Sequence, residues 1–211
     1  MKQIALLGAT GGTGNEFLKQ ALAEGHRVKA LVRKLDKIKI DHPNLVLIEG
    51  DVLKEDDVRT LIQDCDVVAS LFGHVKNSPE WLQTTGTKNI LAAMKSEKVN
   101  KIISLSGGGL PFPEKDQPKF IDKMIRTIMK IAVPKILNDA IAHAELLKKS
   151  NINWIIVRGP RLTNQPKVGK YRVGWVGVDA SSQIGRADLA DFLLKQVESS
   201  QFIGQMPFVS Y

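Results

Sequence analysis

A glycine cluster directly after the first apolar run restricts the fold of this chain more than any other feature. Residues 4–7 form an apolar run that predicts a buried strand, and the next seven residues read Gly-Ala-Thr-Gly-Gly-Thr-Gly. A tight turn from a strand into a helix needs backbone angles that glycine adopts freely, and the helix start offers free N–H groups to a phosphate. The sequence therefore predicts a phosphate-binding loop rather than a turn without a ligand. Its predicted members are Gly8, Thr10, Gly11, Gly12, Thr13 and Gly14.

Short apolar runs alternate with helical patterns along most of the chain. The predicted strands cover residues 4–7, 28–32, 45–48, 67–71, 101–105 and 153–157, and the predicted helices cover residues 15–23, 55–62, 79–95, 120–133, 135–149 and 188–197. This alternation predicts parallel βαβ units, and strands that are apolar throughout are typical of a sheet buried on both faces. We therefore expect the α/β class, with a Rossmann-type doubly wound parallel sheet and helices on both faces.

Composition limits the remaining possibilities. The 211 residues suit one domain over 1–211, and one Cys with four His excludes a disulfide scaffold and a cysteine-built zinc site, so no metal is expected. The 30 basic and 22 acidic residues give a formal charge of +8, but no stacking platform, recognition-helix motif or single basic stripe accompanies it. Neither a leader peptide nor a membrane span is recognisable. We expect a cytoplasmic protein without a nucleic-acid or membrane partner.

The glycine spacing resembles that of the short-chain dehydrogenase/reductase superfamily, in particular its atypical NmrA-like and biliverdin reductase B (flavin reductase) branch. The resemblance spans nearly the whole chain and rests further on residues 50–53, 89–95, 158–160, 165–166 and 186–190. It implies a nicotinamide cofactor and hydride transfer to flavins, quinones or similar conjugated acceptors.

The end of the second predicted strand favours NADP over NAD. Proteins that select NAD usually carry an acid at this place to bind the ribose 2′-hydroxyl, and here Arg33 stands there instead. A guanidinium can bind a 2′-phosphate through two hydrogen bonds, and Lys34 or Lys37 can add positive charge. The alternative is a solvated basic strand end.

The resemblance implies further cofactor contacts at the ends of the later strands. Asp51 and Val52 match the pair beside the adenine ring, although Asp51 can equally be a helix N-cap. Ser106 matches the active-site Ser/Thr next to the nicotinamide and is our candidate catalytic residue, with a simple turn role as the alternative. The remaining expected contacts are Leu71, Phe72, Gly73, Leu105 and Pro160.

The superfamily's catalytic pair, Tyr followed four residues later by Lys, is absent. Neither Tyr171 nor Tyr211 has such a Lys, and the pair's positions fall on the apolar residues Leu137 and Ile141. General acid–base catalysis by that pair is therefore excluded, which is tolerable in hydride transfer to a flavin because water can supply the proton. The family's pocket histidine is replaced by Ala140, and we interpret the nearby His143 as a surface or packing residue.

Two hypotheses follow, and they belong to different classes. The first is an NADPH-dependent reductase in which residues 107–135 and 158–185 form the substrate-side wall. The second is an NmrA-like regulatory protein that senses NADP with little or no catalysis. A basic group near the expected site can attract an anionic acceptor or can be solvated surface: Arg158, Arg161, Lys167, Lys170 and Arg172. The apolar stripe at 120–133 is interpreted as a lid or wall, as core, or as a dimer contact, and we expect a monomer or homodimer.

Overall fold

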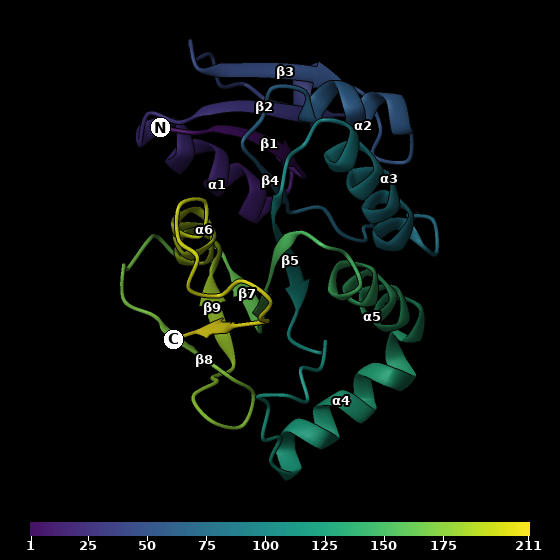
Figure 1. Ribbon diagram of the computed structural model, residues 1–211. Helices are drawn as coiled ribbons and strands as arrows, with labels where there is room; N and C mark the ends of the chain where they lie inside the picture. Colours follow the sequence, from purple (N-terminus) through teal and green to yellow (C-terminus); the bar gives the residue numbers. More distant parts are fainter.

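Six parallel strands form the centre of the sheet in the computed structural model, which describes residues 1–211 (Figure 1). These strands are β1 (Gln3–Leu7), β2 (Arg27–Val32), β3 (Leu45–Glu49), β4 (Val67–Ser70), β5 (Lys101–Gly107) and β6 (Asn153–Gly159). Two short strands extend the sheet beyond β6, namely β10 (Phe208–Ser210), which is parallel to β6, and β8 (Arg172–Gly174), which is antiparallel to β10.

The strand order is β3-β2-β1-β4-β5-β6-β10-β8. The chain builds outward from β1 in one direction and then returns to build outward from β4 in the other. In open α/β sheets a ligand binds outside the carboxyl ends of the strands at such a reversal point. The residues that follow β1 and β4 therefore mark the expected site.

Helices cover both faces of the sheet, which confirms the doubly wound architecture. On one face lie α1 (Gly12–Ala23) and α6 (Arg186–Lys195), and on the other lie α2 (Glu55–Ile62), α3 (Leu82–Ser96) and α5 (Pro134–Lys148) (Figure 1). Alternate residues of β1 supply the two cores, because Leu6 packs with the α1 side and Leu7 with the α2 side. Strands buried on both faces in this way need apolar residues at every position.

The predicted helix at 79–95 begins later than the proline suggested. Pro79 precedes the helix, which starts at Leu82. The start is determined by Asp139 of α5, whose carboxylate accepts hydrogen bonds of 2.8 Å from the backbone N–H groups of Gln83 and Thr84. A cap that comes from another helix has no signal in the local sequence.

The last third of the chain holds short elements that the sequence did not predict. Besides β8 and β10, the strands β7 (Arg161–Thr163) and β9 (Gln183–Gly185) pair in parallel as a separate two-stranded sheet. Earlier in the chain, a short 3-10 helix that the sequence did not predict either, η1 (Leu35–Lys37), follows β2. Each of these elements has three residues, which is too short to show a period of two or 3.6.

The apolar stripe at 120–133 is a helix, α4 (Phe120–Ala132), but its residues do not form part of the core. None of its side chains is buried, so the interpretation as core is wrong. Figure 1 shows α4 extending away from the sheet and joined to α5 by a sharp bend. No helix in the chain is long and apolar enough to span a bilayer.

Candidate functional site

The glycine loop joins β1 to α1 in a conformation that side chains would prevent. Gly8 has a φ of +89°, and a Cβ atom there would lie 2.5 Å from the carbonyl carbon of Leu71. A Cβ on Gly14 would lie 2.0 Å from the carbonyl oxygen of Gly8. The backbone of the loop is thus pressed against the end of β4 and against the first turn of α1. Its exposed N–H groups are those at the start of α1, where a phosphate is stabilised.

A cleft of about 450 Å³ opens at the reversal point between β1 and β4. It brings together nine of the residues expected from the sequence: Gly8, Thr10, Gly11, Arg33, Asp51, Val52, Leu71, Phe72 and Gly73. Arg33 is exposed at its rim and forms no salt bridge, so its guanidinium is free to bind an anion. No acid stands at the end of β2, where an NAD-selective protein carries one.

The floor of this cleft depends on Gly86 of α3, which the sequence analysis missed. A Cβ on Gly86 would lie 2.7 Å from the ring of Phe72 and 2.8 Å from Cγ2 of Val52. The absence of a side chain lets both residues pack onto α3 and present a flat apolar surface. Asp51 is not the N-cap of α2, since Lys54 holds that position. Its carboxylate instead accepts a 2.9 Å hydrogen bond from the N–H of Leu53.

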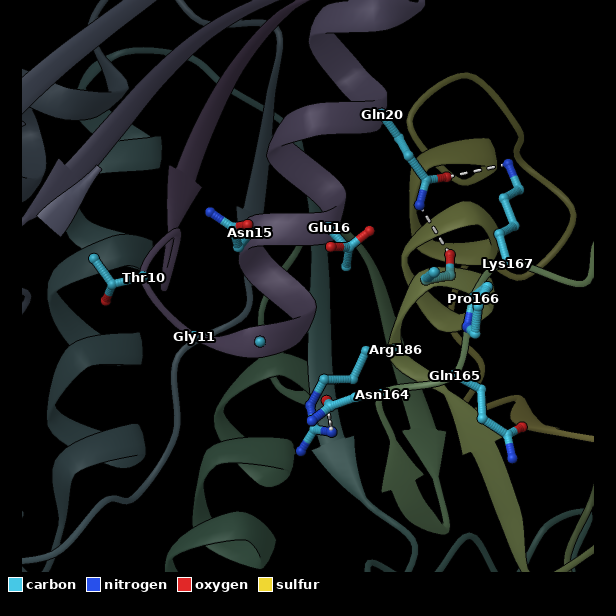
Figure 2. Close-up of a pocket in the computed structure, with 12 residues that line it drawn as sticks. Thr10, Gly11, Asn15, Glu16, Gln20, Asn164, Gln165, Pro166, Lys167 and Arg186 are labelled. Atoms are coloured by element: carbon cyan, nitrogen blue, oxygen red, sulfur yellow. Dashed lines mark hydrogen bonds between the residues drawn. The ribbon is translucent and has the colours of Figure 1, made fainter. Parts of the chain in front are cut away.

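A second, polar cleft of about 620 Å³ lies at the start of α1 and shares Thr10 and Gly11 with the first (Figure 2). Gly12 also lines it, and a Cβ there would lie 2.6 Å from the side chain of Arg186. Figure 2 shows Arg186 close to the first turn of α1, where it donates a 2.6 Å hydrogen bond to Asn164. Arg186 has no carboxylate partner, so the polar cleft holds an unpaired cation beside the positive end of α1.

Sequence reasoning missed Arg186 as a site residue. The signal for it is the motif at 186–190, which the sequence offers as part of the family resemblance. The remaining loop residues, Thr13 and Gly14, are buried in the first turn of α1 and face neither cleft.

The segment after β4, whose residues 73 and 75–79 line the first cleft, is held by a buried carboxylate. Nε2 of His74 lies 2.6 Å from Oδ2 of Asp139, the residue that also caps α3. Burial alone would raise the pKa of Asp139, but hydrogen bonds from Thr84, Gln83 and His74 outweigh it and lower that pKa. Asp139 therefore carries its charge in the structure and ties the segment after β4 to α5.

Ser106 lies at the end of β5 with an unsatisfied hydroxyl. The residue is 6% exposed and its Oγ has no hydrogen-bond partner. Buried hydroxyls are nearly always paired, so Ser106 can bind a group that the chain itself does not supply, such as a ligand or an ordered water. Leu105, Ser106 and Pro160 line neither cleft described above, so the structure does not bring them together with the loop in one cavity.

His143 is a packing residue, not a surface residue. Its ring bridges helices and sheet, with Nδ1 2.7 Å from Oγ1 of Thr87 and Nε2 3.1 Å from Oγ of Ser104. Burial lowers the pKa of His143 to about 4. The imidazole is therefore neutral near pH 7 and has both ring nitrogens engaged, which leaves it no role in proton transfer.

The structure contains one Tyr–Lys contact, but its chemistry differs from that of the superfamily's pair. The hydroxyl of Tyr171 accepts a 3.0 Å hydrogen bond from Lys195 and donates one of 2.6 Å to Asp191. Burial and the Asp191 carboxylate raise the pKa of Tyr171 to about 12, whereas a catalytic tyrosine needs a lowered one. Leu137 is buried on α5 where the superfamily's tyrosine is expected.

Several members of the predicted basic group are paired within the protein, although Lys167 still lines the polar cleft at the start of α1. Arg158 is completely buried and forms two 2.7 Å hydrogen bonds with the carboxylate of Asp116. Lys167 lies 2.6 Å from Asp191, and Arg172 donates to the backbone oxygen of Tyr211. The expectation that this group attracts an anionic acceptor is wrong for Arg158, because its guanidinium is buried and already bound by the carboxylate of Asp116.

A third cleft, of about 470 Å³, lies between α4 and the segments after β5 and β6. It begins at Gly108 and Gly109, two and three residues beyond Ser106, and it is lined by Val176 and Phe208 on the opposite side. Arg126 of α4 also lines it, and the buried Nε of Arg126 has no partner. The cleft therefore combines apolar residues with one unpaired cation, and the carboxylates of Asp116 and Asp122 also belong to its lining.

Comparisons with known proteins agree with this geometry. A family model described as NAD(P)H-binding matches residues 8–200. Protein YwnB of Bacillus subtilis (strain 168) is 26% identical, over 93% of this chain and 92% of that protein. The photosystem II assembly factor Ycf39 of Cyanophora paradoxa is 24% identical, over 94% of this chain and 62% of its own length. A short-chain dehydrogenase/reductase of Veillonella parvula DSM 2008, solved in complex with NADP, has the same fold. Its TM-score is 0.82 at 18% identity, over 100% of this chain and 95% of that one.

Proposed function

Because the chain belongs to the NAD(P)H-binding family, we propose that it is an NADPH-dependent oxidoreductase that reduces a flavin, a quinone or a similar conjugated acceptor. The observation that carries this proposal is the cleft at the reversal point. Its glycine loop is shaped for close approach of a diphosphate, and Arg33 at its rim is free of any carboxylate. A related fold solved with NADP supports the same cofactor.

The residues present fit a dinucleotide phosphate. A Cβ at Gly8 or Gly14 would collide with backbone atoms, so the loop leaves its N–H groups open at the start of α1. Arg33 would bind the 2′-phosphate. A diphosphate at the start of α1 would neutralise the positive charge of Arg186. The unsatisfied hydroxyl of Ser106 would bind the carboxamide of the nicotinamide or a carbonyl of the acceptor. When bound, the reduced cofactor supplies a hydride.

In this proposal the protein contributes binding and orientation, and no side-chain acid. Leu137 and Ile141 replace the superfamily's Tyr and Lys, and His143 is neutral and fully hydrogen-bonded. Flavins and quinones accept a hydride at a conjugated centre, and the anion that forms can take its proton from water. Such acceptors suit this site better than alcohols or sugars, whose reactions need a positioned acid–base group.

We further propose that residues 107–135 and 158–185 form the acceptor's wall within a single domain. The two segments meet at Asp116, whose carboxylate binds Arg158 and the N–H of Val176. The 470 Å³ cleft between them is the proposed acceptor pocket, and Arg126 would bind an anionic group on the acceptor.

A second candidate function is an NADP-sensing regulator with little or no catalysis. The missing Tyr–Lys pair favours it as much as the reductase. A relative named as a photosystem II assembly factor also supports it, because that name describes assembly and not a reaction.

The deciding experiment mixes purified protein with NADPH or NADH and follows the loss of nicotinamide absorbance with a panel of flavins and quinones. We expect NADPH oxidation with at least one acceptor and slower oxidation of NADH. Tight NADPH binding without turnover of any acceptor would contradict the reductase and favour the sensor. Absence of binding to either nicotinamide would contradict both.

A further inference from the structure

Helix α4 exposes an apolar face that nothing in the chain covers. Phe120 is 81% exposed and Ile131 79% exposed, and Ile121, Met124 and Ile128 are exposed with them. Residues 120, 124, 128 and 131 follow the spacing of one helix face, so these side chains form a continuous stripe. A helix of 13 residues is about 20 Å long. An apolar stripe of this length on a projecting helix marks a binding surface and not scattered surface hydrophobicity.

The charged side chains of the same helix are mostly positive. Lys119, Lys123, Arg126 and Lys130 form no salt bridge. The one acid of the helix, Asp122, accepts a 2.8 Å hydrogen bond from the backbone N–H of Lys119 and so serves as a cap. The helix thus combines an apolar face with a row of unpaired cations, which is the pattern of helices that lie in a membrane interface.

This charge argues against a second copy of the chain as the occupant of the face. A symmetric dimer through the apolar stripe would leave the cations on the opposite side of each helix without neutralising partners, because each copy brings only one acid, Asp122, on this helix. Two such positively charged helices repel each other, whereas anionic lipid headgroups would attract Lys119, Lys123 and Lys130.

We propose that α4 docks this protein onto the surface of a bilayer that contains anionic lipids. The stripe from Phe120 to Ile131 lies at the boundary between headgroups and acyl chains, and Lys123 and Lys130 extend to the lipid phosphates. This proposal departs from the expectation of no membrane partner. The inference goes beyond the proposed reductase and does not depend on it, because a membrane-docked sensor would use the same helix.

Docking in this way has a consequence for the acceptor pocket. The opposite edge of α4, with Ile125 and Met129, lines the 470 Å³ cleft. A bilayer under α4 therefore lies next to that cleft, so a lipid-dissolved acceptor such as a quinone would reach it without crossing water.

The test is sedimentation of the full chain with vesicles of phosphatidylglycerol and phosphatidylcholine, compared with vesicles of phosphatidylcholine alone. We expect binding to the anionic vesicles that weakens as the salt concentration rises. Ile128→Glu should reduce the bound fraction about tenfold, because it places a charge in the apolar boundary, and Lys123→Gln with Lys130→Gln should reduce it severalfold. Val46→Glu is the matched control, since Val46 is 51% exposed on β3.

NADPH titration of each variant separates docking from folding and from the proposed function. We expect all these variants to bind NADPH like the wild type, because α4 does not contact the glycine loop. Equal sedimentation with both kinds of vesicle, or none with either, would overturn the proposal. Light scattering that shows a dimer which Ile128→Glu dissociates would also overturn it, in favour of self-association.

Discussion

The carboxylate of Asp116 and the guanidinium of Arg158 form a paired contact, with both hydrogen bonds 2.7 Å long and the arginine side chain fully buried. The arginine also donates to the backbone oxygens of Met206 and Leu110. This pair joins the two segments that we propose as the acceptor's wall. Asp116→Ala would leave a buried charge without its partner, and we expect it to lower the free energy of unfolding by about 3–5 kcal/mol in urea denaturation.

The control for that variant is Glu114→Ala. Glu114 forms a 3.4 Å bridge to Lys148 at the surface, and such a pair contributes at most about 1 kcal/mol. If Asp116→Ala were as stable as Glu114→Ala, the ion pair would not be what holds the wall in place.

Arg33→Ala tests the preference for NADP. Removing a hydrogen bond to a charged group costs about 1.5–3 kcal/mol, so the Kd for NADPH should rise roughly 10- to 150-fold. The Kd for NADH should stay unchanged, since NADH has no 2′-phosphate. Both are measured by fluorescence titration, with Arg27→Ala at the opposite end of β2 as the control. Equal losses for the two cofactors would contradict the 2′-phosphate assignment.

Gly14→Ala tests the loop geometry. The new Cβ would lie 2.0 Å from the oxygen of Gly8, so the loop must move and its N–H groups lose their alignment. We expect calorimetric titration to detect no NADPH binding and the free energy of unfolding to fall by about 1–3 kcal/mol. Gly107→Ala is the control, because no atom lies within 4 Å of a Cβ there. Unchanged binding in Gly14→Ala would show that the phosphates lie elsewhere.

Ser106→Ala separates a ligand contact from a structural one. The hydroxyl has no partner within the protein, so its removal should leave stability unchanged or raise it by about 1 kcal/mol. The rate of acceptor reduction should fall about tenfold, because the nicotinamide or the acceptor loses a hydrogen bond that orients it. Thermal unfolding and steady-state kinetics measure the two effects. A clear loss of stability with full activity would assign Ser106 to turn chemistry instead.

The low pKa of His143 predicts that the folded protein loses stability in acid. Its pKa is about 4 in the folded protein and near 6.5 when unfolded, so the unfolded chain binds the proton first. The free energy of unfolding should therefore fall by about 3 kcal/mol as the pH drops from 6.5 to 4, through this residue alone. His143→Gln keeps hydrogen bonds to Thr87 and Ser104 but should lose this part of the pH dependence. Parallel urea midpoints for both proteins across that range would contradict the assignment.

Several features of the site were predictable because their causes are local. The loop at residues 8–14 needs glycine for its own backbone angles, and Arg33 follows directly from the end of an apolar strand. Parallel strands then bring Gly8, Arg33, Asp51 and Gly73 to one edge, which the alternation of strands and helices already implied.

Other features depend on partners far away in the chain. Arg158 looks like a surface cation beside a strand, yet it is buried because Asp116, 42 residues earlier, neutralises it. The start of α3 depends on a carboxylate 56 residues later, and Arg186 reaches the glycine loop from the opposite end of the sequence. No local pattern carries such pairings.

Helix α4 has one property that depends on the local sequence and another that depends on tertiary packing. The sequence by itself determined that residues 120–132 form an amphipathic helix, because the apolar spacing and the proline that follows are local properties. The tertiary structure alone decided that its apolar face is exposed, because the rest of the chain buries none of the residues of α4. Periodicity specifies which side chains share a face, and the surrounding packing specifies whether that face is buried.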